Sequence, residues 1–242
     1  MKGLLAAVGF LTVLPVPAFA REATARDQAA PWFPVVGLAL GAVVLGASSI
    51  LAPMFPPLVV GALLVSLWAS LTGFLHLDGL ADACDGLLAS GSRERRLEIL
   101  RDPRIGAYGA AGLSLVLLLK AACLAAASAR AAPSLLLAPA LARWLAASLA
   151  IFTPARPDGL GREFHSSARP ASVLLAALTP VLILAAGGLR SVLAAALALA
   201  CAAAIGLLAR CRLGGMTGDV LGLAIEATEV AVLLVHSVEV SR

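Results

Sequence analysis

The sequence predicts an all-α fold, a polytopic transmembrane helical bundle with about seven spans plus an N-terminal hydrophobic segment. Of the 242 residues, 61% are apolar and only 13% are charged, whereas a soluble domain usually carries about a quarter charged residues. The apolar residues form runs of about 20, the length that crosses a bilayer as a helix. The alternation expected of a membrane β-barrel is missing, and a lone apolar segment in lipid satisfies its backbone hydrogen bonds only as a helix.

The long apolar runs define the predicted spans. They cover residues 33–52, 57–75, 107–128, 133–152, 171–187, 191–209 and 217–236. The first apolar segment, 4–16, is too short to place, and with Ala18-Phe19-Ala20 behind it the segment imitates a cleavable signal peptide. We expect it to be retained as a hydrophobic helix broken by Pro15 and Pro17. The chain has no clear repeat or linker, so residues 1–242 are predicted to form a single integral membrane domain.

The distribution of arginines predicts how the chain is oriented in the membrane. With loop 76–106 placed inside, the inside loops carry twelve arginines and the outside connections and tail carry Arg130, Arg190 and Arg242. The positive-inside rule then makes loop 76–106 cytoplasmic. The net charge of +4 therefore reports membrane topology, and we expect no nucleic-acid partner. The inside arginines are Arg21, Arg26, Arg93, Arg95, Arg96, Arg101, Arg104, Arg156, Arg162, Arg169, Arg210 and Arg212.

The first polar motif holds three aspartates that share one helical face. Asp78, Asp82 and Asp85 are spaced i, i+4 and i+7. Three like charges on one face repel each other, so the spacing favours a divalent cation between them, and oxygen ligands with room for phosphates are typical of magnesium. The alternative is a solvated acidic helix end. His76 borders this face as a candidate ligand or base, although an incidental histidine is also compatible with the pattern.

The second polar motif is rich in arginine and follows the aspartates directly. Arg101 and Arg104 flank Asp102, and arginine can bind phosphate through two parallel hydrogen bonds. The alternative is that these charges only set topology and contact anionic lipid. Gly106 and Gly109 would allow the backbone to approach a ligand closely.

The third polar motif begins the last predicted span. Asp219, Glu226 and Glu229 are spaced by seven and then three residues, again on one helical face, and Gly218 belongs to a glycine-rich entry that could cradle phosphate. Carboxylates inside a span are costly and usually line a functional polar cavity, with a proton relay as the alternative. By the same argument Arg143 should pair with an acid or face the cavity, and Lys120 should do likewise or snorkel.

In the predicted topology all three motifs meet at one membrane face, which favours a single active site. A cation- or proton-coupled transporter is a rival reading, but it would place its acids nearer the bilayer midplane. A membrane scaffold is a third reading, and it would not need so many convergent ionisable groups.

At these residues the sequence resembles the cobalamin synthase family, also called adenosylcobinamide-GDP ribazoletransferase. The matching strings follow one another along nearly the whole chain, and the aspartate segment with the downstream Arg-Asp-Pro-Arg-Ile-Gly is specific. One departure is Pro103, which stands where the family often has serine. The strings are Phe10–Pro17, Leu71–Gly86, Arg95–Gly109, Asp158–Gly161 and Gly214–Glu229.

The resemblance implies a reaction and roles for the motif residues. Adenosylcobinamide-GDP and alpha-ribazole, or its 5′-phosphate, would give adenosylcobalamin, or its phosphate, and GMP, with Mg2+ as cofactor. Membrane lipid would surround the enzyme, and a homo-oligomer is left open. The implied metal ligands are Asp78, Asp82 and Asp85, completed by Asp102 or Asp219. The implied catalytic residues are Asp82, Asp85 and Glu226, and the implied substrate-binding residues are His76, Arg101, Arg104, Gly106, Gly218 and Glu229.

Overall fold

The computed structural model describes residues 1–126, 132–157 and 159–238. Within these ranges the chain is helical, and its β pairing is limited to an isolated bridge between Pro154 and Met216. The all-α prediction is therefore confirmed. The helices are α1 (Lys2–Leu11), η1 (Ala18–Arg21), α2 (Ala23–Arg26), η2 (Ala30–Trp32), α3 (Phe33–Leu51), α4 (Pro57–Leu71), α5 (Leu75–Leu88), α6 (Arg93–Ile99), α7 (Ala107–Ala126), α8 (Ala132–Leu149), α9 (Leu160–Ser167), α10 (Pro170–Ala176), α11 (Leu178–Leu213) and α12 (Gly218–Ser237).

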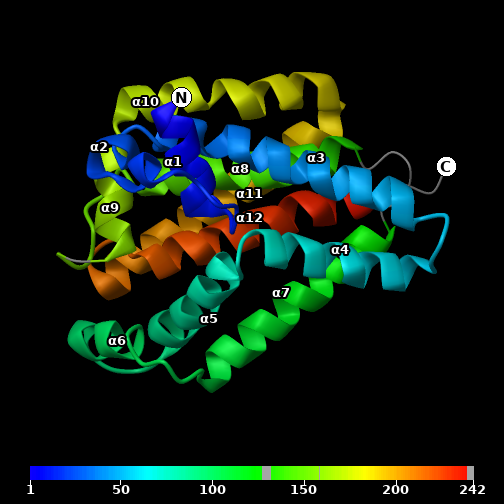
Figure 1. Cartoon of the computed structure of the whole chain (residues 1–242). Helices are drawn as coiled ribbons and strands as arrows, with labels where there is room; N and C mark the ends of the chain where they lie inside the picture. The colour runs from blue at the N-terminus through cyan, green and yellow to red at the C-terminus, as the bar shows by residue number, and fades with distance from the viewer. Residues whose placement is uncertain (127–131, 158, 239–242) are drawn as a thin grey trace.

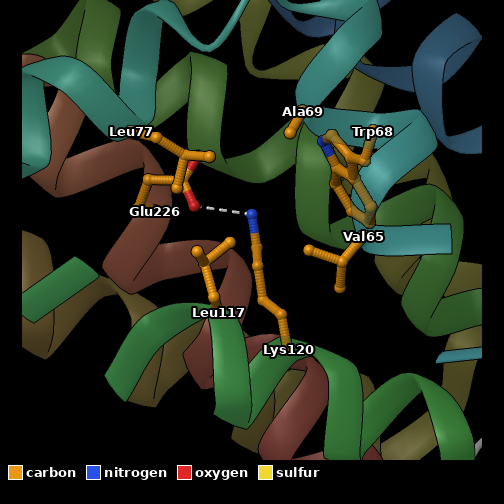
Figure 2. Close-up of a pocket in the computed structure, with 7 residues that line it drawn as sticks. All are labelled: Val65, Trp68, Ala69, Leu77, Leu117, Lys120 and Glu226. Carbon is orange, nitrogen blue, oxygen red and sulfur yellow. Dashed lines mark hydrogen bonds and ion pairs between the residues drawn. The ribbon is translucent and has the colours of Figure 1, made fainter. Parts of the chain in front are cut away.

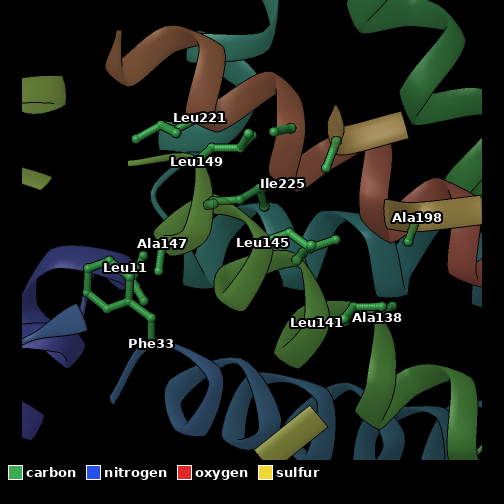
Figure 3. Close-up of a cluster of buried hydrophobic side chains, with 14 of the residues drawn as sticks. Leu11, Phe33, Ala138, Leu141, Leu145, Ala147, Leu149, Ala198, Leu221 and Ile225 are labelled. Atoms are coloured by element: carbon green, nitrogen blue, oxygen red, sulfur yellow. The ribbon is translucent and has the colours of Figure 1, made fainter. Parts of the chain in front are cut away.

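Helix α8 lies inside the bundle, with α3, α11 and α12 packed around it (Figure 1). Its apolar side chains meet those of α12 in the core, where Leu145 and Leu149 lie near Ile225 and Leu221 (Figure 3). These side chains are almost fully buried. Lipid offers no hydrophobic drive for such contacts, so close packing itself holds the helices together.

Two glycines allow α3 to approach α8 closely. A Cβ atom on Gly37 would lie 2.3 Å from the Pro139 carbonyl oxygen, and one on Gly41 would lie 2.2 Å from the Leu135 carbonyl oxygen. The two glycines are one helical turn apart, which is the small-xxx-small pattern of tightly packed membrane helices. These two positions therefore fix the contact between the third helix and the buried eighth helix.

Large apolar side chains point away from the bundle. Leu118 on α7 is 68% exposed, Leu174 on α10 is 76% exposed, and Leu189 on α11 is 73% exposed. A helical surface covered with exposed leucines suits contact with lipid tails, in keeping with the predicted membrane location.

The predicted count of seven spans is not confirmed. Among the described residues, four helical segments are long and apolar enough to cross a membrane, or five if α4 and α5 count as one broken span. Two of the predicted spans, 171–187 and 191–209, form one helical run of 44 residues interrupted by a kink at Gly188. The predicted span 57–75 ends early, at Leu71, where the chain bends by 92° into α5. The four segments are Ala30–Leu51, Ala107–Ala126, Ala132–Leu149 and Pro170–Leu213.

The N-terminal segment forms α1, which is shorter than a span and packs against α3, with Leu11 fully buried. Some residues used in the sequence argument lie outside the described ranges. They are Arg130 and Arg242 of the orientation count, the end of the predicted span 107–128, and Asp158 of the matched string Asp158–Gly161.

Candidate active site

A sharp bend brings the aspartate helix α5 against α12. Gly73 and Phe74 both have left-handed backbone angles, with φ of 60° and 59°, and they separate α4 from α5. Close approach then depends on glycines in both helices. A Cβ on Gly79 would lie 3.2 Å from the Asp219 Cα atom, and one on Gly222 would lie 3.0 Å from the His76 carbonyl oxygen.

This contact unites acids from the first and third sequence motifs. Asp78 is exposed, whereas Asp82 and Asp219 are half-buried. Helix α5 is not one of the four segments that are long and apolar enough to cross a membrane by themselves, and it passes that test only together with α4. Partial burial together with the negative charges of Asp78, Asp219 and Asp85 raises the pKa of Asp82 to about 6. Asp78, Asp82 and Asp219 therefore form one anionic cluster, the surface cluster, which a cation would stabilise.

One cation of the chain already faces this cluster. The Arg156 guanidinium lies in the segment after α8, and its Nη2 atom is 2.7 Å from Asp219 Oδ2. From the sequence, Arg156 was predicted only to be a topology charge. Its position two residues before the matched string at 158–161 is a sequence signal that could have singled it out.

Asp85 has a different environment from Asp82. Its two oxygens accept hydrogen bonds from the backbone N–H groups of Gly106 at 2.7 Å and Gly109 at 2.9 Å. Asp85 thus satisfies two orphan donors where α7 begins, as a capping residue does. The expected close approach at Gly106 and Gly109 is therefore made to a carboxylate of this chain, while ligand contact at Gly106 and metal binding by Asp85 stay predictions.

Replacing Gly109 by alanine should destabilise this junction. The added Cβ would lie 2.3 Å from Asp85 Oδ2 and 2.8 Å from the Ala81 carbonyl oxygen, so α5 and α7 must move apart. We expect a loss of about 1–3 kcal/mol in the free energy of unfolding, measured by denaturation of the purified protein in detergent. Gly46→Ala on α3 is the control, because nothing lies within 4 Å of its added Cβ. Equal stability of the two variants would contradict the packing described here.

The second motif lies at the surface. Arg104 forms a two-pronged ion pair with Asp102, with Nε 2.9 Å from Oδ1 and Nη2 2.6 Å from Oδ2. These hydrogen bonds hold the pKa of Asp102 down at about 2. Arg101 is exposed at the same edge. The predicted roles of Arg101 and Arg104 in substrate binding, and of Asp102 in metal binding, stay predictions.

A second ionic cluster, the deep cluster, lies further inside and joins three helices. Lys120 on α7 has its Nζ 2.6 Å from Glu226 Oε2, the ion pair drawn in Figure 2, and 2.5 Å from Glu229 Oε2, and both acids lie on α12. Arg143 on α8 pairs with the other oxygen of Glu229. All four side chains are buried, and two cations balance two acids. Of the alternatives expected for Arg143 and Lys120, pairing with an acid is the one that the structure shows.

His76 links the deep cluster to the aspartate helix. Its Nδ1 atom is 3.4 Å from Arg143 Nη2, and its ring is buried. A small cavity of about 10 Å³ lies beside Lys120 and Glu226 and is bordered by Trp68, whose ring centroid is 4.9 Å from Lys120 Nζ (Figure 2). The buried Trp68 Nε1 and His76 Nε2 atoms make no hydrogen bond among the described residues. A single water molecule would fit such a space.

The acids of α12 therefore occupy two levels. Asp219 and Glu226 are seven residues apart, which corresponds to about 10 Å along a helix. Asp219 belongs to the surface cluster with Asp78 and Asp82, whereas Glu226 and Glu229 belong to the deep ionic cluster. Gly218 is the first residue of α12 and directly follows Thr217, whose side chain caps the helix. It lies next to Asp219 of the surface cluster. The surface cluster can bind cations and is accessible to a substrate that arrives from the aqueous phase. The deep cluster can hold α5, α7, α8 and α12 together.

The described residues hold no ready-made group of three His, Cys, Asp or Glu side chains placed to bind a metal ion. Asp219 is turned toward Arg156, and Asp85 toward the start of α7. Any metal bound at the surface cluster would thus need some of its ligands from a substrate or from water.

Comparisons with known proteins agree with the resemblance noted in the sequence. The family model described as cobalamin-5-phosphate synthase matches residues 3–237. A protein of Pseudomonas paraeruginosa (strain DSM 24068 / PA7) named adenosylcobinamide-GDP ribazoletransferase is 42% identical over 243 residues, covering 97% of each chain. Proteins of the same name from Stutzerimonas stutzeri (strain A1501) and Roseiflexus sp. (strain RS-1) are 41% and 40% identical.

The coverage of these relatives is nearly complete. The Stutzerimonas stutzeri protein matches over 100% of both chains, and the Roseiflexus protein matches 94% of this chain and 86% of its own length. No solved structure matches the chain. The resemblance stated from the motifs is confirmed, and the chain belongs to the cobalamin-5-phosphate synthase family.

Proposed function

We propose that the chain joins adenosylcobinamide-GDP to alpha-ribazole, or to alpha-ribazole 5′-phosphate, and releases GMP. The corrinoid product is adenosylcobalamin or its 5′-phosphate. In this proposal the reaction depends on magnesium and takes place at the cytoplasmic face of a bacterial inner membrane. The curated relatives carry the name of this transferase, and the arginine count supports the orientation.

The observation that carries the proposal is the anionic surface cluster of Asp78, Asp82 and Asp219. These carboxylates fit magnesium in their chemistry, because magnesium in phosphate-transferring enzymes is typically bound through one or two carboxylates, with the remaining ligands from substrate phosphates and water. The absence of a ready-made three-residue site among the described residues is compatible with that arrangement. The raised pKa of Asp82 supports it, since crowded acids gain from a cation.

The residues of the chain would act by binding, orienting and neutralising. Asp78, Asp82 and Asp219 would hold magnesium, which supplies charge neutralisation on the pyrophosphate. The ribose hydroxyl of alpha-ribazole would form a bond to the cobinamide-side phosphorus and release its proton to a base or to water, while the bond to the GMP oxygen breaks and GMP leaves. In-line positioning is therefore essential. Asp85 fixes the start of α7 beside the cluster, and Arg101 and Arg104 lie at the surface where the leaving GMP could be bound.

The test uses purified protein in liposomes with each substrate omitted in turn. We expect GMP release and a new corrinoid product only when adenosylcobinamide-GDP and alpha-ribazole phosphate are both present. GMP release without the second substrate would contradict the transferase, because it would indicate hydrolysis. Folded protein that forms no product, yet moves a proton or cation across the liposome membrane, would instead favour the transporter reading.

A further inference from the structure

The side chain of Arg156 faces the acids of the surface cluster. Its guanidinium pairs with Asp219 at 2.7 Å, and both side chains are mostly but not fully buried, with 16% and 21% exposed. Neighbouring arginines are engaged differently. Arg93, Arg96 and Arg212 donate to main-chain carbonyl oxygens at the ends of α5 and α11 and in the segment after α8.

The backbone that leads to Arg156 is firmly anchored. The Ala155 N–H donates to the Met216 carbonyl oxygen at 2.7 Å, and the Met216 N–H donates to the Thr153 carbonyl oxygen at 3.0 Å. Gly215 makes this contact possible, since a Cβ there would lie 2.4 Å from the Thr153 carbonyl oxygen. The glycine-rich entry to α12 is thus used to dock the segment that presents Arg156. The position of the Arg156 Cα atom is fixed relative to Asp219, whereas its long side chain can still change direction.

A cation and Arg156 compete for the same carboxylate. A divalent ion bound to Asp219 would repel a guanidinium at hydrogen-bond distance, and it would bring substrate phosphates with it. Guanidinium groups bind phosphate oxygens as well as they bind carboxylates. Arg156 can therefore pair with Asp219 in the empty site and with a substrate phosphate in the occupied site, and it stays at the site in both.

We infer that Arg156 exchanges partners. It neutralises Asp219 when no substrate is bound, and it binds a phosphate of the pyrophosphate substrate once a divalent cation has taken Asp219. This inference rests on the proposed function, because it assumes the cation at the surface cluster. Arg156 is then a substrate-binding residue that also keeps the empty cluster from holding metal tightly.

The inference predicts two opposite changes in Arg156→Gln. Without substrate, Mn2+ should bind roughly fivefold more tightly than to the wild type, because a competing positive charge is gone. The KM for adenosylcobinamide-GDP should rise by about tenfold, because a charged hydrogen bond to phosphate is lost. Arg156→Lys keeps the charge but loses the planar fork, so its Mn2+ affinity should stay near the wild-type value while its KM rises.

The experiment measures Mn2+ binding to the full chain in detergent by the electron paramagnetic resonance signal of free Mn2+, and then KM with both substrates. Arg95→Gln is the matched control, since Arg95 is exposed and pairs with Glu98 on α6. Tighter Mn2+ binding with a higher KM in Arg156→Gln supports the exchange. Unchanged or weaker Mn2+ binding in Arg156→Gln, with normal binding in the wild type, overturns it. No Mn2+ binding by either the active wild type or Arg156→Gln would overturn the proposed metal site as well. If Arg156→Gln does not fold, an unchanged KM in Arg156→Lys overturns the phosphate contact.

Discussion

Replacing Glu229 by leucine is expected to destabilise the protein by about 3–5 kcal/mol, the usual effect of removing one partner from a buried ion pair. Glu229 is fully buried and pairs with both Lys120 and Arg143. Its loss leaves two buried cations facing one acid, Glu226. The change would be measured as the free energy of unfolding of purified protein in detergent.

Two comparisons show whether the loss of stability in Glu229→Leu comes from the unpaired cations or from a nonspecific effect of the substitution. Glu98→Leu removes a partner from the exposed pair with Arg95 and should change stability by less than about 0.5 kcal/mol. Combining Glu229→Leu with Arg143→Met restores the balance of charge in the deep cluster, because Lys120 keeps Glu226. The double variant should therefore be more stable than Glu229→Leu alone. A double variant that is less stable than either single variant would contradict the account of the deep cluster.

Asp82→Asn is expected to lower kcat by about 10³-fold, because a metal-binding carboxylate contributes several kcal/mol to the transition state. The same change should leave the free energy of unfolding unchanged or higher. Partial burial, together with the neighbouring acids, raises the pKa of Asp82, so a neutral side chain of the same shape removes both the cost of burying charge and the repulsion. A loss of activity combined with equal or greater stability is typical of functional residues held at a cost to the fold.

The control for Asp82→Asn is Glu94→Gln, the same chemical change at an exposed acid of α6. Steady-state GMP release and thermal unfolding would be measured for both variants. Asp82→Asn with more than about a tenth of wild-type kcat would be incompatible with a metal ligand at this position.

The fold class could be predicted because composition and run length determine it, whereas the span count could not. Hydropathy does not indicate that Gly188 interrupts one long helical run, or that the left-handed Gly73 and Phe74 turn α5 through 92°. Both features depend on backbone angles at single residues. The length of an apolar run therefore predicts membrane helices better than it predicts where each begins and ends.

At the candidate site, too, some features could be predicted from the sequence and others could not. The cost of buried charge was enough to predict pairing with an acid as one of the alternatives for Lys120 and Arg143, beside a cavity-facing or snorkelling side chain. The spacing on α12 could not show that Asp219 joins the surface cluster while Glu226 and Glu229 join a deeper one, because that depends on which faces of α5, α7 and α8 meet α12. Arg156 was missed because its role depends on contacts between the segments at 153–155 and 214–217.

The most direct test of the central claim follows GMP release by purified wild-type protein as free magnesium is raised from zero, in EDTA, to the millimolar range. Both substrates are held at saturating concentrations, and the corrinoid product is identified at each step. We expect no transfer in EDTA, with full recovery when magnesium is restored. Transfer at an undiminished rate in EDTA would contradict a magnesium-dependent reaction at Asp78, Asp82 and Asp219.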